Sequence, residues 1–292
     1  MKSATFDTTA SGKTYPLHYK IWGEENPNTL VCVHGLTGNS QDFKFIGEVL
    51  SQKNYRVVAI DMAGRGESSY FENPDDYNFD QYLIDLNALL NIIGCNYPSS
   101  CDWLGVSMGG LLGFRLSGLD NSPINRLILS DIGPEVPQFD LNFISQILKL
   151  NPEYTHPTFA VPFLKMAIGT PYSRGPLDEH QWLYFAEIAL KKREDGIYVK
   201  NFDPQIAQKF DTEPLGNQDL WGFWEKTYQP TLSLRGELST LFPLRVLEQM
   251  ILRKPNNKFK SETIIGAGHV PSLFTSDQIE IIEKWLMATS TP

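Results

Sequence analysis

Residues 103–110 read Trp-Leu-Gly-Val-Ser-Met-Gly-Gly, and this cluster constrains the fold more than any other feature of the chain. A short apolar run precedes the serine, and apolar residues at helical spacing follow it. A strand, a sharp turn and a helix around Ser107 would expose its hydroxyl for nucleophilic chemistry. Gly105 and Gly109 lack a Cβ, which lets the strand and the helix approach closely beside the serine. We therefore expect a nucleophile on a strand–helix turn.

Length, charge and cysteine content limit the classes of protein to consider. The 292 residues suffice for one large core, or for a core with an inserted lobe. A net charge of −9 disfavours nucleic acid as a partner, because nucleic-acid binding needs clustered Lys and Arg. No segment approaches the roughly 18 apolar residues of a membrane span, and the N-terminal residues carry no apolar signal core.

Three cysteines (Cys32, Cys95 and Cys101) lack metal-ligand spacing and are typical of a reducing compartment. We therefore expect a cytoplasmic protein with no metal, no cofactor, and no nucleic-acid or membrane partner. The sequence makes no prediction of an oligomeric state.

Strands alternate with helices in the first half of the chain. Apolar runs predict strands at 16–21, 30–33, 55–60, 101–105 and 126–129, and apolar residues at helical spacing predict helices at 43–50 and 79–93. Such alternation is typical of an α/β fold, with a mostly parallel sheet covered by helices on both faces.

The pattern changes after residue 132. Residues 133–229 carry helical patterns and prolines, and strand character returns only at 231–234 and 262–265, before a C-terminal helix at 276–287. We therefore expect residues 1–132 and 230–292 to form the core and residues 133–229 to form a helical cap. An insert at the carboxyl edge of the sheet would lie over the binding crevice.

Four segments together resemble the α/β-hydrolase superfamily. They are residues 34–36 (His-Gly-Leu), 61–68 (Asp-Met-Ala-Gly-Arg-Gly-Glu-Ser), 105–110 (Gly-Val-Ser-Met-Gly-Gly) and 268–269 (Gly-His). More narrowly, residues 102–110, 131–135 and 266–273 look like a bacterial branch of capped serine hydrolases and esterases. The resemblance covers nearly the whole chain and implies an α/β-hydrolase fold with a helical cap inserted after the sixth strand. Such motifs are specific for fold and mechanism but not for substrate.

A serine hydroxyl needs a base to remove its proton, and histidine is suited to this because its pKa lies near working pH. Of the five histidines, His269 lies in a Gly-rich loop after the last strand pattern, where the resemblance places the base. His34 belongs to the His-Gly turn and is expected to shape that turn. We therefore expect His269 to be the base.

The acid that orients this histidine is less obvious. The resemblance implies an aspartate after the seventh strand in a Gly-x-x-Asp pattern, but Ser239 and Thr240 occupy the expected positions. Neither side chain can stabilise an imidazolium as a carboxylate does. We favour Asp131, at the end of the sixth strand, as the acid, with Glu237 as the alternative. A dyad without an acid is the third reading.

The oxyanion hole needs backbone N–H groups aimed at the developing negative charge. The resemblance implies that Met108 and Leu36 supply them, with Gly35 permitting a tight turn before Leu36.

Large apolar side chains in the insert are expected mostly to build its core, with a few lining an apolar pocket. They are Phe159, Phe163, Leu164, Met166, Trp182, Tyr184, Phe185, Trp221 and Trp224. No Arg cluster or Gly-rich phosphate cradle is present in the sequence. The expected substrate is therefore a small to medium apolar ester or thioester.

The leading hypothesis is a serine hydrolase of carboxylic esters that works through an acyl-enzyme. Thioesterase, lactonase and carbon–carbon bond hydrolase activities remain open on the same machinery. A non-catalytic ligand receptor and a cofactor-free lyase or perhydrolase are the alternatives on this scaffold. The serine at position 107 argues against dehalogenase and epoxide hydrolase chemistry, because those members of the family have an aspartate there.

Overall fold

The computed structural model describes residues 1–167, 174–208, 220–254 and 258–289. Its main sheet has eight strands: β1 (Lys2–Ala10), β2 (Lys13–Trp22), β3 (Asn28–Val33), β4 (Tyr55–Ile60), β5 (Cys101–Val106), β6 (Ile124–Ser130), β9 (Thr231–Gly236) and β10 (Phe259–Ile264). Their order in the sheet is β1-β2-β4-β3-β5-β6-β9-β10. β2 pairs antiparallel with β1 and β4, and all other neighbours are parallel. The predicted mostly parallel sheet is confirmed.

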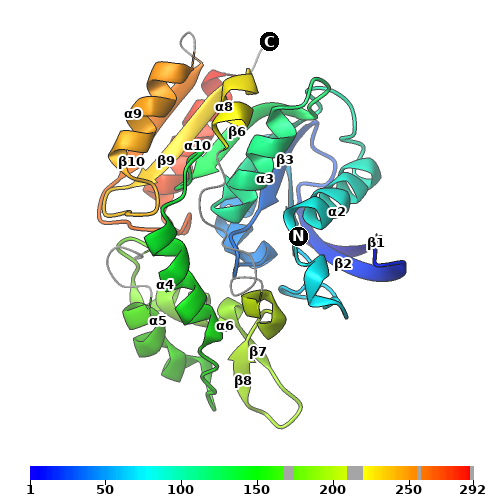
Figure 1. Cartoon of the computed structure of the whole chain (residues 1–292), viewed down its shortest axis with the longest axis vertical. Coiled ribbons are helices and arrows are strands. Elements are labelled where there is room, and N and C mark those ends of the chain that lie inside the picture. The colour runs from blue at the N-terminus through cyan, green and yellow to red at the C-terminus, as the bar shows by residue number, and fades with distance from the viewer. Residues whose placement is uncertain (168–173, 209–219, 255–257, 290–292) are drawn as a thin grey trace.

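Helices cover both faces of this sheet (Figure 1). One face packs on α1 (Lys44–Ser51) and α10 (Ser276–Ala288), and the other packs on α2 (Phe79–Ile92), α3 (Met108–Ser117), α8 (Trp221–Lys226) and α9 (Leu244–Arg253). Successive side chains of a strand point to opposite faces. In β6, accordingly, Leu127 and Leu129 join the core on the α3 side, while Ile128 joins the core on the α10 side. The sheet is therefore apolar on both faces, as a central parallel sheet requires.

The segment between β6 and β9 holds a group of shorter elements. They are α4 (Gln138–Lys149), the 3-10 helix η3 (Pro157–Ala160), α5 (Val161–Ala167), α6 (Glu179–Ala189), the hairpin strands β7 (Leu190–Lys192) and β8 (Tyr198–Lys200), and the 3-10 helix η4 (Pro204–Gln208). Figure 1 shows α4, α5, α6, β7 and β8 together at one end of the molecule, beyond the sheet. The last helix, α8, packs instead on the sheet half, where Trp224 meets Phe114 of α3 at a ring-centroid distance of 5.8 Å.

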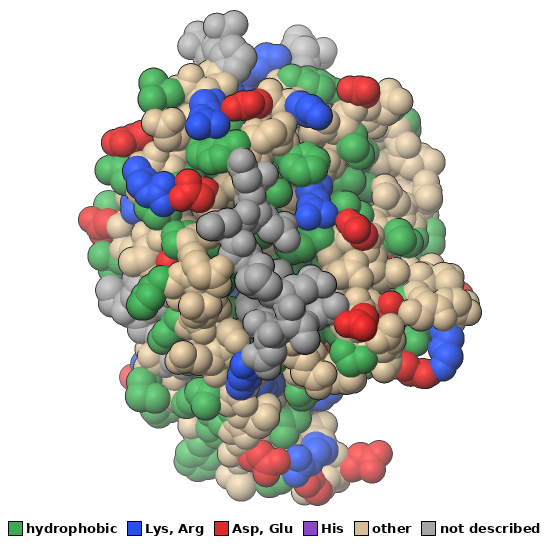
Figure 2. All heavy atoms as spheres, in the orientation of Figure 1, with side chains coloured by type: hydrophobic (Ala, Val, Ile, Leu, Met, Phe, Trp, Pro, Cys, Tyr) green, Lys and Arg blue, Asp and Glu red, His purple; other side chains and the backbone are tan. Residues whose placement is uncertain are grey.

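None of the helices in the described ranges reaches the length and apolar character that crossing a bilayer requires. On the face shown in Figure 2, acidic and basic side chains are interspersed and hydrophobic side chains are scattered among them. Neither sign of charge therefore dominates that face.

Candidate active site

Ser107 lies at the junction of β5 and α3, in a turn that the flanking glycines make possible. Its φ of 48° and ψ of −111° are uncommon for a residue with a side chain. A Cβ on Gly105 would lie 2.3 Å from the carbonyl oxygen of Gly109, and one on Gly109 would lie 2.0 Å from the carbonyl oxygen of Val33. The strand and the helix therefore approach so closely that only glycine fits at either position.

Three side chains form a continuous hydrogen-bonded chain at this turn. His269 Nε2 lies 3.0 Å from Ser107 Oγ, and His269 Nδ1 lies 2.8 Å from Asp131 Oδ2. Because a carboxylate only accepts, Nδ1 carries the proton and Nε2 is left to accept from the serine hydroxyl. The Asp131 side chain is fully buried, and that of His269 is 10% exposed. The three side chains have the geometry that a nucleophile, a base and an orienting acid require.

Asp131 is held by the strand next to its own. β6 pairs with β9, so the carboxyl ends of the two strands meet at one edge of the sheet. The backbone N–H of Gly236 donates to Asp131 Oδ1 at 2.7 Å, and the hydroxyl of Ser239 donates to Oδ2 at 2.5 Å. The serine at the position where an aspartate was expected is thus a hydrogen-bond partner of the acid itself. Thr240 donates instead to Asp140.

Glu237, the alternative acid, forms a hydrogen bond with a different partner. Its Oε2 accepts from the backbone N–H of Gly266 at 3.0 Å, in an exposed setting. The carboxylate that faces His269 is that of Asp131.

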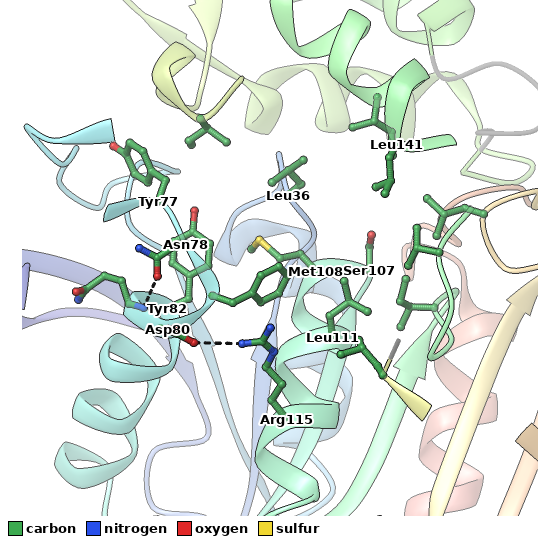
Figure 3. Close-up of a pocket in the computed structure, with 18 of the residues that line it drawn as sticks. Leu36, Tyr77, Asn78, Asp80, Tyr82, Ser107, Met108, Leu111, Arg115 and Leu141 are labelled. Atoms are coloured by element: carbon green, nitrogen blue, oxygen red, sulfur yellow. Dashed lines mark hydrogen bonds and ion pairs between the residues drawn. The ribbon is translucent and has the colours of Figure 1, made fainter. Parts of the chain in front are cut away.

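The two residues expected to supply oxyanion-hole amides lie beside the serine. Leu36 and Met108 line the same cavity as Ser107 (Figure 3). Met108 is the first residue of α3, and the first N–H groups of a helix have no partner within it. The expected turn is present, because the carbonyl oxygen of Gly35 accepts from the N–H of Gly38 at 3.1 Å.

His34 and Arg65 form hydrogen bonds with the backbone of the turn that contains Gly35 and Leu36. His34 Nε2 accepts from the N–H of Met62 at 3.0 Å and Nδ1 lies 2.6 Å from the carbonyl oxygen of Gly35, so the ring is a neutral bridge. Burial lowers the pKa of His34 to about 4. The buried Arg65 donates through Nε to the carbonyl oxygen of Leu36 at 2.9 Å. Sequence reasoning missed this contact, since nothing in the motif indicates which carbonyl the guanidinium reaches.

One group of side chains has the composition of a metal site. His18, Asp61 and Glu67 each place one potential ligand atom within 4.8 Å of the others. Hydrogen bonds account for Asp61, which accepts from His18 Nδ1 at 2.8 Å and from the backbone of Ser40 and Glu67. Lys20 Nζ, 3.0 Å from Glu67, supplies a cation to the group. The cluster is therefore a set of hydrogen bonds and one Lys20–Glu67 ion pair that links β2 to the loop after β4.

A cavity of about 820 Å³ opens beside Ser107. One wall is aliphatic and is built by Leu111, Ile132, Val136, Leu141, Ile144, Ile206, Leu220 and Leu241. The part of the lining that residues 75–82 and Arg115 supply is polar and aromatic. Figure 3 shows Ser107 between the two, with Leu141 on one side and Arg115 on the other.

The insert contributes to this cavity through aliphatic residues and not through the large apolar side chains expected from the sequence. None of those nine is among the described residues that line this cavity, so the expectation that a few of them line the pocket beside Ser107 is wrong. Trp182 and Phe185 instead pack in the core of the lobe, and Phe163, Leu164 and Phe185 line a second cavity of about 120 Å³. Large aromatic rings pack in the core of the insert because they bury the most apolar area there.

Comparisons with known proteins agree with this geometry. A family model of the α/β hydrolase fold matches residues 28–275. The 3-hydroxybutyrate-oligomer hydrolase of Cupriavidus necator is 31% identical over 274 residues, which cover 91% of this chain and 91% of the relative. The chain belongs to the α/β-hydrolase family.

More distant similarities extend over the same length. The pimeloyl-(acyl-carrier protein) methyl ester esterase of Aliivibrio fischeri is 24% identical, covering 91% of this α/β hydrolase and 95% of the relative. A solved α/β hydrolase from Novosphingobium aromaticivorans superposes with a TM-score of 0.84 at 27% identity, over 98% of each chain. A crystal structure from Rickettsia typhi gives a TM-score of 0.89 at 27% identity, over 99% of this chain and 100% of the other. The protein is therefore a hydrolase.

Proposed function

We propose that this α/β hydrolase is a serine hydrolase of carboxylic esters, with Ser107 as nucleophile, His269 as base and Asp131 as the orienting acid. The observation that carries the proposal is the hydrogen-bonded chain of 3.0 Å and 2.8 Å from Ser107 through His269 to Asp131. These hydrogen-bonded side chains lie beside a cavity whose volume of about 820 Å³ is within the range of small-molecule binding sites.

The first half of the reaction forms an acyl-enzyme. Ser107 Oγ attacks the ester carbonyl carbon while its proton passes to His269 Nε2. The N–H groups of Leu36 and Met108 stabilise the oxyanion of the tetrahedral intermediate. The bond between the carbonyl carbon and the ester oxygen then breaks, and the leaving alkoxide takes the proton from His269. Asp131 stabilises the charged imidazolium throughout.

The second half returns the enzyme to its starting state. Water attacks the acyl carbon while its proton passes to His269 Nε2. The bond to Ser107 Oγ breaks, and the serine recovers the proton from His269. The carboxylic acid released carries one oxygen from water.

The names of the relatives support an oxygen ester over a thioester, and the cavity bears on the acyl group. An aliphatic wall suits an apolar acyl group. Two relatives are named for hydrolysis of a hydroxybutyrate oligomer and of a methyl ester. We propose that residues 133–229 act as a helical cap, because Leu141 and Ile144 of α4 line the cavity that contains Ser107.

Hydrolysis of p-nitrophenyl butyrate in ¹⁸O-labelled water tests this function. We expect the wild type to release butyrate with one ¹⁸O atom and Ser107→Ala to show no turnover above background. Turnover that persists in Ser107→Ala, or a product without ¹⁸O, would contradict the proposal. The second result would favour lyase chemistry, and an inactive, folded wild type would favour the receptor hypothesis.

A further inference from the structure

The polar end of the cavity holds a cation in a defined position. Arg115 is the one Lys or Arg among the described residues that line the cavity around Ser107. It lies on α3 eight residues after Ser107, a rise of about 12 Å along the helix at 1.5 Å per residue. Side chains of a helix lean towards its N-terminus, which brings the guanidinium closer to Ser107 than that rise. Figure 3 shows the guanidinium directed towards the cavity.

Two neighbouring side chains hold Arg115 in place. Its guanidinium carbon lies 4.8 Å from the centre of the Phe79 ring, a contact that orients the guanidinium plane. Its side chain is 21% exposed, and Nη1 lies 3.2 Å from Asp80 Oδ1. The Asp80 side chain is 90% exposed, and such an exposed ion pair contributes little free energy. A carboxylate from a bound molecule can therefore take the place of Asp80.

The two ends of the cavity differ in the chemistry they accept. The aliphatic wall beside Ser107 suits an acyl group, and the guanidinium of Arg115, which lines the cavity together with Asp75 and Asp80, can bind two acceptor oxygens of an anion. A linear ester of a hydroxy acid has both features, since its alcohol portion ends in a free carboxylate. A separation of up to about 12 Å corresponds to at most roughly ten extended single bonds. One or two hydroxy-acid units thus fit between Ser107 and the guanidinium.

We propose that the substrates are linear oligoesters of hydroxy acids and that Arg115 binds their free terminal carboxylate. This inference rests on the proposed ester hydrolase function and narrows its substrate class. The relative from Cupriavidus necator, named for a 3-hydroxybutyrate oligomer, belongs to the same chemical class. Ser107 would cleave the ester one or two units from the carboxylate end and release a short hydroxy acid.

A comparison of two matched substrates tests the assignment. The probes are the linear trimer of 3-hydroxybutyrate as the free acid and the same trimer as its methyl ester, which differ only in the terminal charge. We expect the ratio of kcat/KM for the acid to that for the methyl ester to fall about tenfold to a hundredfold in Arg115→Gln. Arg115→Lys should retain part of the ratio, because it keeps the charge but loses the planar fork.

A second variant tests whether the Asp80 carboxylate competes with the substrate for Arg115. Asp80→Asn removes the competing carboxylate at an exposed position and should raise the same ratio. An unchanged ratio in both Arg115→Gln and Asp80→Asn would overturn the inference. Failure of the proposed function is distinguishable, because then the wild type would show no Ser107-dependent hydrolysis of p-nitrophenyl butyrate either.

Discussion

Ser239 donates a hydrogen bond of 2.5 Å to Asp131 Oδ2, the same oxygen that lies 2.8 Å from His269 Nδ1. The family resemblance implies an acid close to position 239, on the loop after β9. In this chain the carboxylate beside His269 comes from the neighbouring strand β6, and the serine on the β9 loop donates to it. The carboxyl group beside the histidine therefore comes from a different strand than the resemblance implies.

Removal of the Ser239 hydroxyl should weaken catalysis without abolishing it. Ser239→Ala takes one charge-assisted hydrogen bond from Asp131 and another from the N–H of Phe242. We expect kcat for p-nitrophenyl butyrate to fall about tenfold. Ser239→Thr keeps the hydroxyl and should retain most of the activity. Equal losses in the two variants would mean that packing at this position, and not the hydroxyl, matters.

Two isosteric substitutions distinguish the candidate acids. Asp131→Asn should lower kcat by about 10⁴-fold, because an amide cannot stabilise the imidazolium and favours the wrong tautomer. Glu237→Gln should change kcat less than twofold, since Glu237 is bonded to the backbone of Gly266. Steady-state kinetics on one ester measure both. The opposite ranking would contradict the assignment of Asp131.

Chain-length preference should depend on the aliphatic wall. Leu141→Trp adds bulk to the cavity beside Ser107, so kcat/KM for a hexanoyl ester should fall relative to that for an acetyl ester. Phe139→Trp is the matched control, because Phe139 lies on the same helix but is 76% exposed. A series of p-nitrophenyl esters measures the preference. A similar shift in the control would place the effect outside the cavity.

The buried Lys254 should make stability depend on pH. Burial lowers its pKa to about 7, and its Nζ donates to Thr231 Oγ1 at 2.9 Å. Between that value and the ordinary lysine pKa of about 10.4, the unfolded chain binds a proton that the folded chain does not. Stability therefore rises with pH across this window, by up to about 1.4 kcal/mol per pH unit from this residue.

Lys254→Met should remove this contribution. Urea unfolding at pH 7, 8, 9 and 10 should show a smaller rise in the free energy of unfolding than in the wild type. The exposed Lys226→Met is the control and should keep the wild-type rise. Parallel curves for wild type and Lys254→Met would show that Lys254 titrates normally in the folded state.

The central strands could be predicted from sequence because their side chains are buried on both faces. The helices around them could be predicted because their apolar residues recur at helical spacing. The apolar run at 55–60 coincides with β4 (Tyr55–Ile60). β1 was missed because its buried face is made by Phe6, Thr8 and Ala10, and two of these residues are small or polar. The alternation was nonetheless present, with a turn at Ser11 after it.

Two further elements carried signals that the sequence analysis did not use. The buried residues Val246, Leu247 and Met250 of α9 have helical spacing after Pro243. The β7–β8 hairpin is mostly polar, and its local signal is the Asp195-Gly196 turn, where Gly196 has a φ of 88°. Three-residue strands that are mostly half-buried lack the hydrophobic pattern on which strand prediction depends.

Some residues of the candidate site could likewise be predicted from the sequence, and others could not. Ser107 and His269 carry local glycine-rich signals, so sequence alone indicates them. The choice between Asp131 and Glu237 depends on the pairing of β6 with β9 and on the side chains that face His269. Arg115 carries no motif, and its place in the cavity follows from its position on α3 relative to Ser107.

Covalent labelling with a small fluorophosphonate tests the central claim most directly, because the probe reacts with a serine that a neighbouring base activates. Intact-mass measurement should show one adduct on the wild type and none on Ser107→Ala, with both proteins folded by circular dichroism. Equal labelling of the two proteins, or no labelling of folded wild type, would contradict an activated serine at position 107.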